Sequence, residues 1–271
     1  MTFVSDTFPD AATAVFATVL SGVLGLAVGS FLNVVVWRLP QGRSLASPPS
    51  ACPACGARIR ARDNVPVLSW LLLRGRCRDC AEPVSRRYPL VEAGTAALFV
   101  VVTLHAGLVW ALPAYLYVTA VSVALVLIDL DVHRLPDALT LPSYGVLAAL
   151  LTAAAWLGDD WGSLARAGIG LLALGLFYLV VFVVYPAGMG FGDVKLSGIV
   201  GLVLGWLGWG PLVVGAFGAF LLGGVFSVVL LATRVVDRKS GIPFGPWMIA
   251  GLALGALVGA PLWNAYLGLM V

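Results

Sequence analysis

Residues 112–137 read LPAYLYVTAVSVALVLIDLDVHRLPD, an apolar run that ends in three aspartates and a histidine. A helix of about 20 mostly apolar residues can cross the hydrocarbon core of a bilayer. An ionised carboxylate near the bilayer centre costs roughly 2.5–3.5 kcal/mol, so an acid in such a helix requires a specific role. The stretch therefore predicts a membrane helix that carries an acidic group near one end.

The rest of the chain has the same apolar character. Of its 271 residues, 61% are hydrophobic and only 11% are charged, and the mean hydropathy of +1.01 is far above that of soluble domains. The sequence predicts an all-α polytopic membrane protein. Eight segments approach or reach the length of a span: 12–37, 90–107, 110–132, 139–157, 166–186, 195–209, 212–233 and 245–268. The segment 195–209 is short and rich in glycine, which leaves seven spans as the alternative.

The distribution of basic residues predicts the orientation in the membrane. Ten of the sixteen Lys and Arg residues lie in the loop 38–89, which we therefore expect in the cytoplasm. Eight alternating spans leave Arg166 outside and place five further basic residues inside: Arg134, Lys195, Arg234, Arg238 and Lys239. Residues 1–11, which include Asp6, and the C-terminus are then expected outside. The net charge of +3 is accounted for by this topology, so we expect a lipid bilayer and no nucleic acid as partner.

All four cysteines lie in the loop 38–89, as two Cys-x-x-Cys pairs separated by 21 residues: Cys52, Cys55, Cys77 and Cys80. This spacing is typical of a four-thiolate zinc site on a small ribbon. Disulfides are an alternative, but thiols stay reduced in the cytosol. An iron–sulfur cluster and a redox-active dithiol remain further alternatives. Since four protein ligands leave no position for water, the predicted role of the metal is structural.

The three aspartates that follow the apolar run have different expected roles. Asp129 and Asp131 are two positions apart, which is about 200° around a helix, so only one of them can face a shared site. We interpret Asp131 as a solvated charge at the interface. Asp137 follows Pro136 and is predicted to be the N-cap of the next span.

A further carboxylate, Asp193, lies in the glycine-rich stretch GMGFGDVK at 188–195. The structural alternative is an ordinary turn with Lys195 extended to the interface. The topology, however, places Asp193 at the same depth as Asp129, so the two could meet across a helix bundle. Two carboxyl groups in one site share a proton, and such a pair can activate water against a peptide carbonyl without a metal. Because the pair titrates as a unit, the sequence does not assign the proton to either aspartate.

Six motifs in order give the chain a resemblance to a known family. They are GSFLNVVVWRLP (29–40), CPAC (52–55), NVPVLSWLLLRGRCRDC (64–80), SRRYPLVE (85–92), IDLDVHRLPDALTLP (128–142) and GMGFGDVK (188–195). The chain resembles the prepilin peptidases, also called type IV leader peptidases, which are multi-pass aspartic proteases of the bacterial inner membrane. The resemblance implies that Asp129 and Asp193 are the catalytic aspartates.

The resemblance also implies two activities and a division of the chain. Long members of the family cut the leader of type IV prepilins and pseudopilins at the cytoplasmic face and then methylate the new N-terminus with S-adenosyl-L-methionine. Residues 12–92 would hold the first span and the zinc-binding and N-methylation region, and residues 93–271 the peptidase domain. This chain has no strand–GxGxxG–helix unit and its loop is too short for a Rossmann domain, so the methyl donor needs another site. The candidate residues are Asn33, Arg38, Arg87 and Glu92.

Each of these four candidates also has an ordinary structural interpretation. Asn33 could form a hydrogen bond between helices, Arg38 and Arg87 could be positive-inside anchors, and Glu92 could be a buried partner of an arginine. Competing functions are a peptidase without methyltransferase activity, a proton-coupled transporter, and a scaffold whose zinc loop binds a cytosolic partner. A transporter predicts an inverted repeat and polar groups at the midplane; we find no convincing repeat, and the aspartates lie near one face. The sequence does not indicate an oligomeric state.

Overall fold

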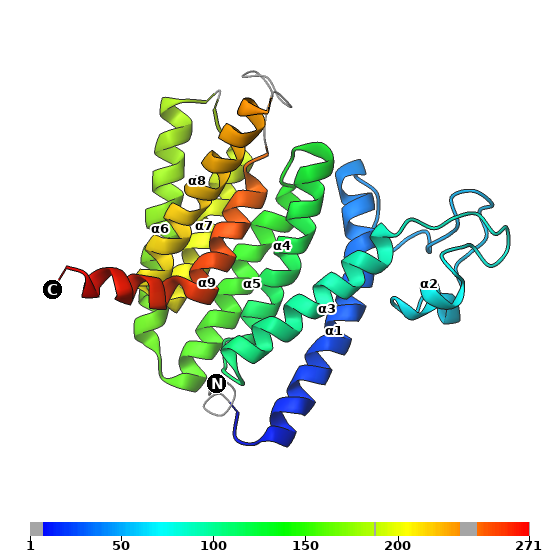
Figure 1. Ribbon diagram of the computed structural model, residues 1–271, viewed down its shortest axis with the longest axis horizontal. Helices are drawn as coiled ribbons and strands as arrows, with labels where there is room; N and C mark the ends of the chain where they lie inside the picture. The colour runs from blue at the N-terminus through cyan, green and yellow to red at the C-terminus, as the bar shows by residue number, and fades with distance from the viewer. Residues whose placement is uncertain (1–7, 187, 234–242, 271) are drawn as a thin grey trace. The chain divides into compact units, whose positions relative to one another are not determined.

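The computed structural model describes residues 8–186, 188–233 and 243–270, in which nine α-helices and two 3₁₀ turns are formed (Figure 1). The helices are α1 (Ala11–Arg38), α2 (Leu68–Leu72), α3 (Arg87–Ala106), α4 (Leu112–Val132), α5 (Asp137–Gly158), α6 (Trp161–Val184), α7 (Phe191–Leu207), α8 (Trp209–Ala232) and α9 (Gly245–Gly268). The turns are Leu39–Gln41 and Ala61–Asp63. The prediction of an all-α protein is confirmed. Asp6, Arg234, Arg238 and Lys239, used in the orientation argument, lie outside the described residues.

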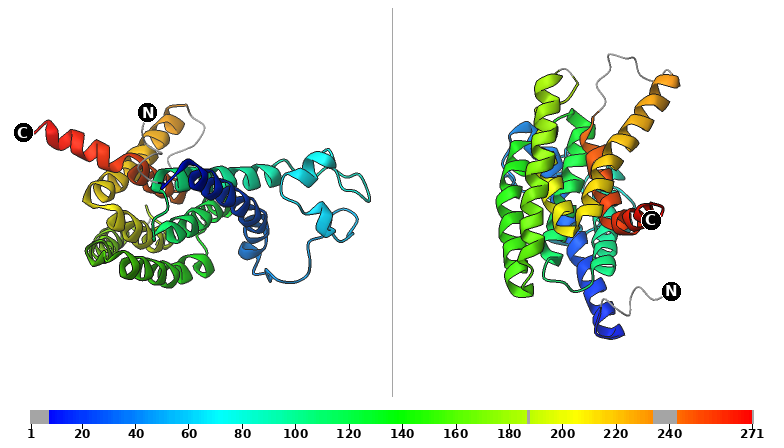
Figure 2. Two further views of the ribbon diagram at one scale, coloured as in Figure 1. Left: turned by 90° about the horizontal axis from the view of Figure 1, so that it is seen from below. Right: turned by 90° about the vertical axis from the view of Figure 1, so that its left-hand side faces the viewer.

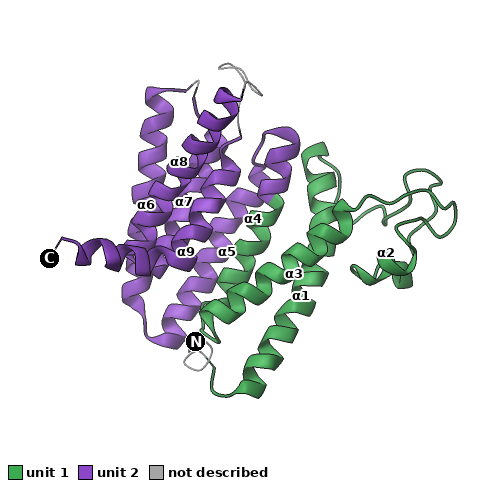
Figure 3. Cartoon of the chain, in the orientation of Figure 1, with its two compact units in different colours: residues 1–124 green, residues 125–271 purple. Residues whose placement is uncertain are grey.

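The chain divides into two compact units, residues 1–124 and 125–271, with the boundary inside α4 (Figure 3). Unit 1 contains α1, the cysteine loop with α2, α3 and the first part of α4. Unit 2 contains the last two turns of α4 and α5 to α9. This division by packing is distinct from the functional boundary expected after Glu92, which stays a prediction.

Within the described residues, seven helices are long and apolar enough to cross a membrane: α1, α3, α4, α5, α6, α8 and α9. The protein is therefore a multi-pass membrane protein. The eighth expected span corresponds to α7, which has 17 residues. At 1.5 Å per residue it is about 25 Å long, shorter than the roughly 30 Å hydrocarbon core. The count of eight spans stays a prediction.

In unit 1, α1 and α3 run antiparallel in close contact. A Cβ atom on Gly25 would lie 2.6 Å from Cα of Ala96, and one on Gly29 would lie 2.7 Å from Cα of Glu92. The Thr103 hydroxyl donates a buried hydrogen bond of 2.7 Å to Ser21 across the same interface. Small residues four apart thus let the two backbones approach, as is common between membrane helices.

In unit 2, α7 is the central helix, since twelve of its 17 residues are buried. Glycines allow the neighbouring helices to approach it closely. A Cβ on Gly201 would lie 2.2 Å from the carbonyl oxygen of Gly170 in α6. On another side of α7, Leu204 lies against Gly215 of α8 and Gly255 of α9. Figure 2 shows α8 and α9 running beside one another as the second closely packed pair of this unit.

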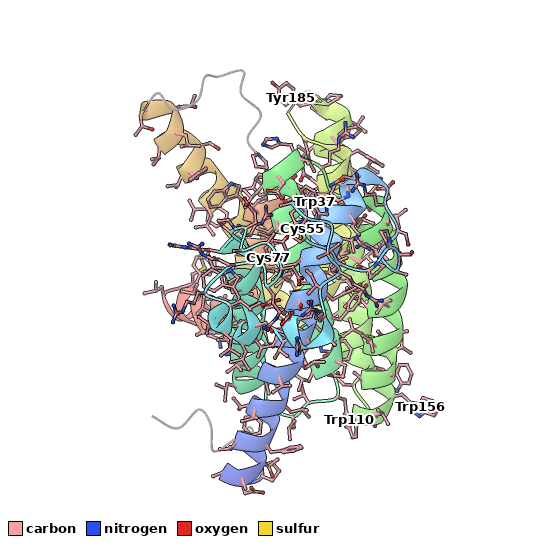
Figure 4. All side chains as sticks on the ribbon, turned by 90° about the vertical axis from the view of Figure 1, so that its right-hand side faces the viewer. Trp37, Cys55, Cys77, Trp110, Trp156 and Tyr185 are labelled. Carbon is pink, nitrogen blue, oxygen red and sulfur yellow. The ribbon has the colours of Figure 1, made fainter. Side chains whose placement is uncertain are left out.

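Exposed aromatic side chains mark the two ends of unit 2. Trp156, in the last turn of α5, is 77% exposed, and Tyr185, directly after α6, is 63% exposed. They lie at opposite ends of the helices (Figure 4). Tryptophan and tyrosine are enriched at both membrane–water interfaces. These residues therefore agree with helices that cross a bilayer from end to end.

The close approach of α1 and α3 can be tested by adding a methyl group at position 25. We expect Gly25→Ala to lower the free energy of unfolding by about 1–3 kcal/mol, because the new atom overlaps the backbone of α3. Thermal unfolding in detergent measures the loss. Gly94→Ala is the matched control, since a Cβ at position 94 meets nothing within 4 Å; equal stability of the two variants would contradict the prediction.

Candidate functional site

Two buried carboxylates lie in unit 2 on different helices. Asp129, in the last turn of α4, is 5% exposed, and Asp193, in the first turn of α7, is 8% exposed. Asp131 is exposed, in agreement with the helical separation of Asp129 from Asp131. Burial of two acids in an apolar bundle is costly, so this arrangement indicates a site rather than a solvated edge.

The glycine-rich stretch before Asp193 forms the start of α7. Gly190 is the N-cap, and the N–H of Asp193 donates to its carbonyl oxygen at 3.0 Å. In return, the N–H of Gly190 donates to Oδ2 of Asp193 at 3.2 Å. A carboxylate three residues into a helix satisfies an otherwise unpaired amide in this way. Asp193 is thus held in the first turn of a helix that begins four residues earlier than the expected span.

Leu135 lies beside glycines that neighbour each of the two aspartates. A Cβ on Gly192 would lie 3.1 Å from Cβ of Leu135, and a Cβ on Gly245 would lie 3.3 Å from its Cδ2 atom. The same Cβ on Gly245 would lie 2.7 Å from Oδ2 of Asp129. Asp129 and Asp193 are also near enough to interact electrostatically. The end of α4 and the beginnings of α7 and α9 therefore meet around the two carboxylates.

One oxygen of this site lacks a partner. Oδ2 of Asp129 is buried and has no hydrogen bond of ordinary geometry among the described residues. Buried polar atoms are nearly always hydrogen-bonded, to protein or to water, so an exception requires an explanation such as a catalytic role. The two aspartates thus differ. Oδ2 of Asp193 accepts a hydrogen bond from a backbone N–H, whereas Oδ2 of Asp129 accepts none of ordinary geometry.

The predicted N-cap role of Asp137 is wrong. The N-cap of α5 is Pro136, in an extended conformation, and Asp137 is the first helical residue and makes no capping hydrogen bond. Its carboxylate instead accepts a hydrogen bond of 2.5 Å from Nζ of Lys195. Pro136 occupies the N-cap position, and the carboxylate of Asp137 pairs with a cation on α7. Lys195 joins α7 to α5, and its ammonium lies 4.9 Å from the centre of the Phe191 ring.

Sequence reasoning missed the contributions of Leu135, Gly245 and Tyr178 to this site. Tyr178 of α6 is buried and interacts electrostatically with Asp193. Its ring centre lies 6.3 Å from that of Phe244, which precedes Gly245. The dipeptide Gly245-Pro246 is a helix-start signal. This dipeptide, however, does not indicate a contact with Asp129, which lies 116 positions earlier in the chain.

The four cysteines converge in unit 1, and Figure 4 shows Cys55 and Cys77 close together on the loop. All four are free thiols, and their Sγ atoms lie within 4.8 Å of one another. Zn–S bonds of about 2.3 Å in a tetrahedron place the sulfurs about 3.8 Å apart. The separation of 3.8 Å between Sγ of Cys52 and of Cys80 fits this geometry. The cysteine cluster can hold a metal ion.

The two cysteine turns have the same backbone design. In each, the N–H of the first cysteine donates to the carbonyl five residues later, Ala57 or Glu82. Its own carbonyl accepts from the residue four positions later, which has positive φ in both turns: Gly56 at 70° and Ala81 at 58°. In the first turn, the backbone N–H groups of Cys55 and Ala54 lower the pKa of the Cys52 thiol to about 7. This favours the thiolate form of Cys52, whereas burial and the three neighbouring thiols raise the pKa of Cys80.

Two ion pairs connect the second cysteine turn to the preceding 3₁₀ turn. Arg78 donates to both oxygens of Asp63, with the shortest contact at 2.6 Å, and Arg60 donates to Asp79 at 2.8 Å. The hydrogen bonds from Arg78 hold the pKa of Asp63 below its usual value. Arg78 and Asp79, the two central residues of the motif CRDC, thus both connect the second cysteine turn to residues 60–63.

Three of the four candidate methyl-donor residues make backbone hydrogen bonds inside unit 1. Asn33 donates to the carbonyl of Tyr88 at 3.2 Å, which links α1 to α3. Arg38 donates to carbonyls of the following loop, including that of Pro48 at 2.7 Å. Glu92 is buried and accepts from the N–H of Val67 at 2.7 Å, so an amide takes the place of the expected arginine. Arg87 is exposed at the start of α3.

Comparison with known proteins divides the chain into two matching regions. Residues 23–106 match the bacterial peptidase A24 N-terminal domain, and residues 115–228 match the type IV leader peptidase family. A protein of Aeromonas salmonicida named prepilin leader peptidase/N-methyltransferase is 39% identical, over 84% of this chain and 87% of its own. The proteins of that name from Pseudomonas aeruginosa and Stutzerimonas stutzeri are 37% and 36% identical, each over 90% of this chain and over 91% and 92% of their own.

No solved structure matches the chain significantly. Both family matches follow one another in a single chain, and identities above 30% extend over most of this chain and of its relatives. The expected family is confirmed, and the chain belongs to the type IV leader peptidase family.

Proposed function

We propose that the protein removes the leader peptide of type IV prepilins or pseudopilins and then methylates the new N-terminus. The observation that carries the peptidase assignment is the pair of buried carboxylates, Asp129 and Asp193, on two helices of one unit. The relatives named prepilin leader peptidase/N-methyltransferase support both activities. In this proposal Asp129 and Asp193 are the catalytic residues, and the enzyme is an aspartic endopeptidase.

The mechanism uses one ionised and one protonated carboxyl group. The carboxylate takes a proton from water while the water oxygen bonds to the scissile carbonyl carbon. The neutral partner gives its proton to the carbonyl oxygen, which forms a tetrahedral diol. The C–N bond then breaks, the leaving nitrogen takes up a proton from the first aspartate, and the second recovers its proton as the carbonyl re-forms.

The orientation of the protein follows from the charge of the loop. Ten basic residues at 38–89 favour a cytoplasmic loop in the bacterial inner membrane, with the active site on the cytoplasmic face and both termini outside. A substrate with a basic leader and an apolar helix would enter sideways among the helices, which brings its cleavage point to the interface. Crosslinking of the scissile bond to the outer face would contradict this orientation.

The second activity is assigned to the N-terminal region. Cleavage releases an α-amine, whose neutral form would take the methyl group of S-adenosyl-L-methionine, with the carbon–sulfur bond breaking to release S-adenosyl-L-homocysteine, and would then lose a proton. Asn33, Arg38, Arg87 and Glu92 remain the candidate residues near the donor. The hydrogen bonds of Asn33, Arg38 and Glu92 to backbone atoms give them a structural role as well.

The metal of the cysteine cluster is proposed to be structural Zn²⁺, held by the thiolates of Cys52, Cys55, Cys77 and Cys80. With all four ligands from the protein, the ion would fix the two turns and take no part in peptide cleavage. The loop is small and has few buried apolar residues, so a metal would supply much of its stability.

The peptidase assignment is tested with a prepilin-like substrate whose leader removal is followed by size. We expect Asp129→Asn and Asp193→Asn each to reduce cleavage at least about 1,000-fold, as for other residues that act as a catalytic unit. Asp131→Asn is the matched control and should cleave like the wild type, because Asp131 is exposed. Cleavage at the wild-type rate by both catalytic variants would refute the assignment.

The order of the two activities is tested with a methyl donor that carries a labelled methyl group. The label should enter the processed product only, because the acceptor amine does not exist before cleavage. With Asp129→Asn, full-length substrate should stay unlabelled, whereas a substrate supplied already cleaved should be methylated. Complete cleavage by the wild type without label at saturating donor would reduce the protein to a peptidase.

The metal is tested by elemental analysis of the purified protein. We expect about one zinc ion per chain, and its loss in Cys52→Ser and Cys77→Ser, since each removes one of four ligands. Brief treatment with a chelator should leave peptidase activity in place as long as the loop stays folded. A preparation with full activity and no bound metal in any sample would overturn the zinc assignment.

A further inference from the structure

The first residue of α9 lies directly against Asp129, one of the two proposed catalytic residues. Position 245 is glycine, and a Cβ atom there would lie 2.7 Å from Oδ2 of Asp129, closer than such atoms come in real proteins. This oxygen is buried and has no hydrogen bond of ordinary geometry among the described residues. The unpartnered atom of the site therefore faces a position where the chain has no side chain.

The beginning of α9 also carries a favourable charge for a carboxylate. The first N–H groups of a helix have no partner inside it, and the helix dipole adds partial positive charge at this end. The backbone amide of Gly245 lies close enough to act on the carboxylate of Asp129. The buried oxygen and the helix terminus are thus two independent observations at one place. The match to the type IV leader peptidase family ends at residue 228, so it does not include α9.

Neighbouring groups hold position 245 in place. Phe244, the preceding residue, has its ring centre 5.4 Å from that of Phe220 in α8 and 6.3 Å from that of Tyr178 in α6. Leu135 closes another side, with Cδ2 3.3 Å from the position of an added Cβ. Farther along α9, Gly251 lies so near α8 that a Cβ there would be 2.5 Å from the carbonyl oxygen of Gly215. The start of α9 cannot retreat from Asp129 without disturbing these contacts.

We propose that Gly245 is a positioning residue of the aspartate site. Because Gly245 lacks a Cβ atom, α9 can place its N-terminal amides beside Asp129 without displacing the carboxylate. A side chain at this position would push the carboxylate out of its place in the catalytic pair. This inference rests on the proposed peptidase function and adds α9 to the helices that form its site.

The kinetic test compares three glycines of the same helix. We expect Gly245→Ala to lower kcat about 10- to 100-fold with KM unchanged, because small displacements of a catalytic group cost this much. Gly268→Ala, where a Cβ meets nothing within 4 Å, should match the wild type. Gly259→Ala, where a Cβ would lie 2.7 Å from Cα of Pro211 and far along α9 from Asp129, should lower the melting temperature and leave kcat of the folded enzyme unchanged. Wild-type kcat in Gly245→Ala would overturn the inference while the proposed function stands.

A double-mutant cycle tests the same contact without relying on activity. Gly245→Ala should lower the melting temperature by about 2–4 °C more when residue 129 is Asp than in an Asp129→Ala background. Gly259→Ala should lower the melting temperature by the same amount in both backgrounds. If Gly245→Ala fails to fold alone but folds with Asp129→Ala, the contact is supported; equal loss in both backgrounds overturns it. Absence of cleavage by the wild type refutes the proposed function, whatever the cycle shows.

Discussion

The close approach of helix backbones around α7 is the constraint on which unit 2 depends. Gly170 and Gly201 allow the backbones of α6 and α7 to contact each other directly. On another side of α7, Leu204 packs against Gly215 and Gly255. Helices in lipid gain little from the hydrophobic effect between them, so close contact of their surfaces is the main source of association. A central helix held on several sides gives Asp193, in its first turn, a defined position.

The polar groups of this unit gather where helices begin and end. Unpaired amides at the start of a helix stabilise negative charge, so a carboxylate costs less there than in the middle of a span. Gly190 donates to Asp193, the start of α9 faces Asp129, and the ion pair of Asp137 with Lys195 joins α5 to α7 beside them. A bundle of apolar helices can hold two buried acids because the ends of its helices meet there.

Unit 1 uses different means to order its loop. Two turns of the same backbone design bring four thiols together. The ion pairs of Arg78 with Asp63 and of Arg60 with Asp79 connect the second turn to the preceding segment. Exposed ion pairs alone contribute little stability. The loop is tied to the membrane helices by Glu92 of α3, whose buried carboxylate accepts from Val67 at the start of α2. Val67 has φ of 60°, a conformation costly for a β-branched residue, and this hydrogen bond helps to hold it.

The sequence by itself determined the features that depend on neighbours along the chain. Apolar runs predicted every long helix to within five residues, the rotation per residue separated Asp129 from Asp131, and the paired Cys-x-x-Cys turns indicated the metal cluster. Only the tertiary structure decided the partner of Asp137, the burial of α7 and the place of Gly245. These depend on contacts between helices far apart in the chain. Hydropathy and periodicity report which residues avoid water, but they do not report which helix lies against which.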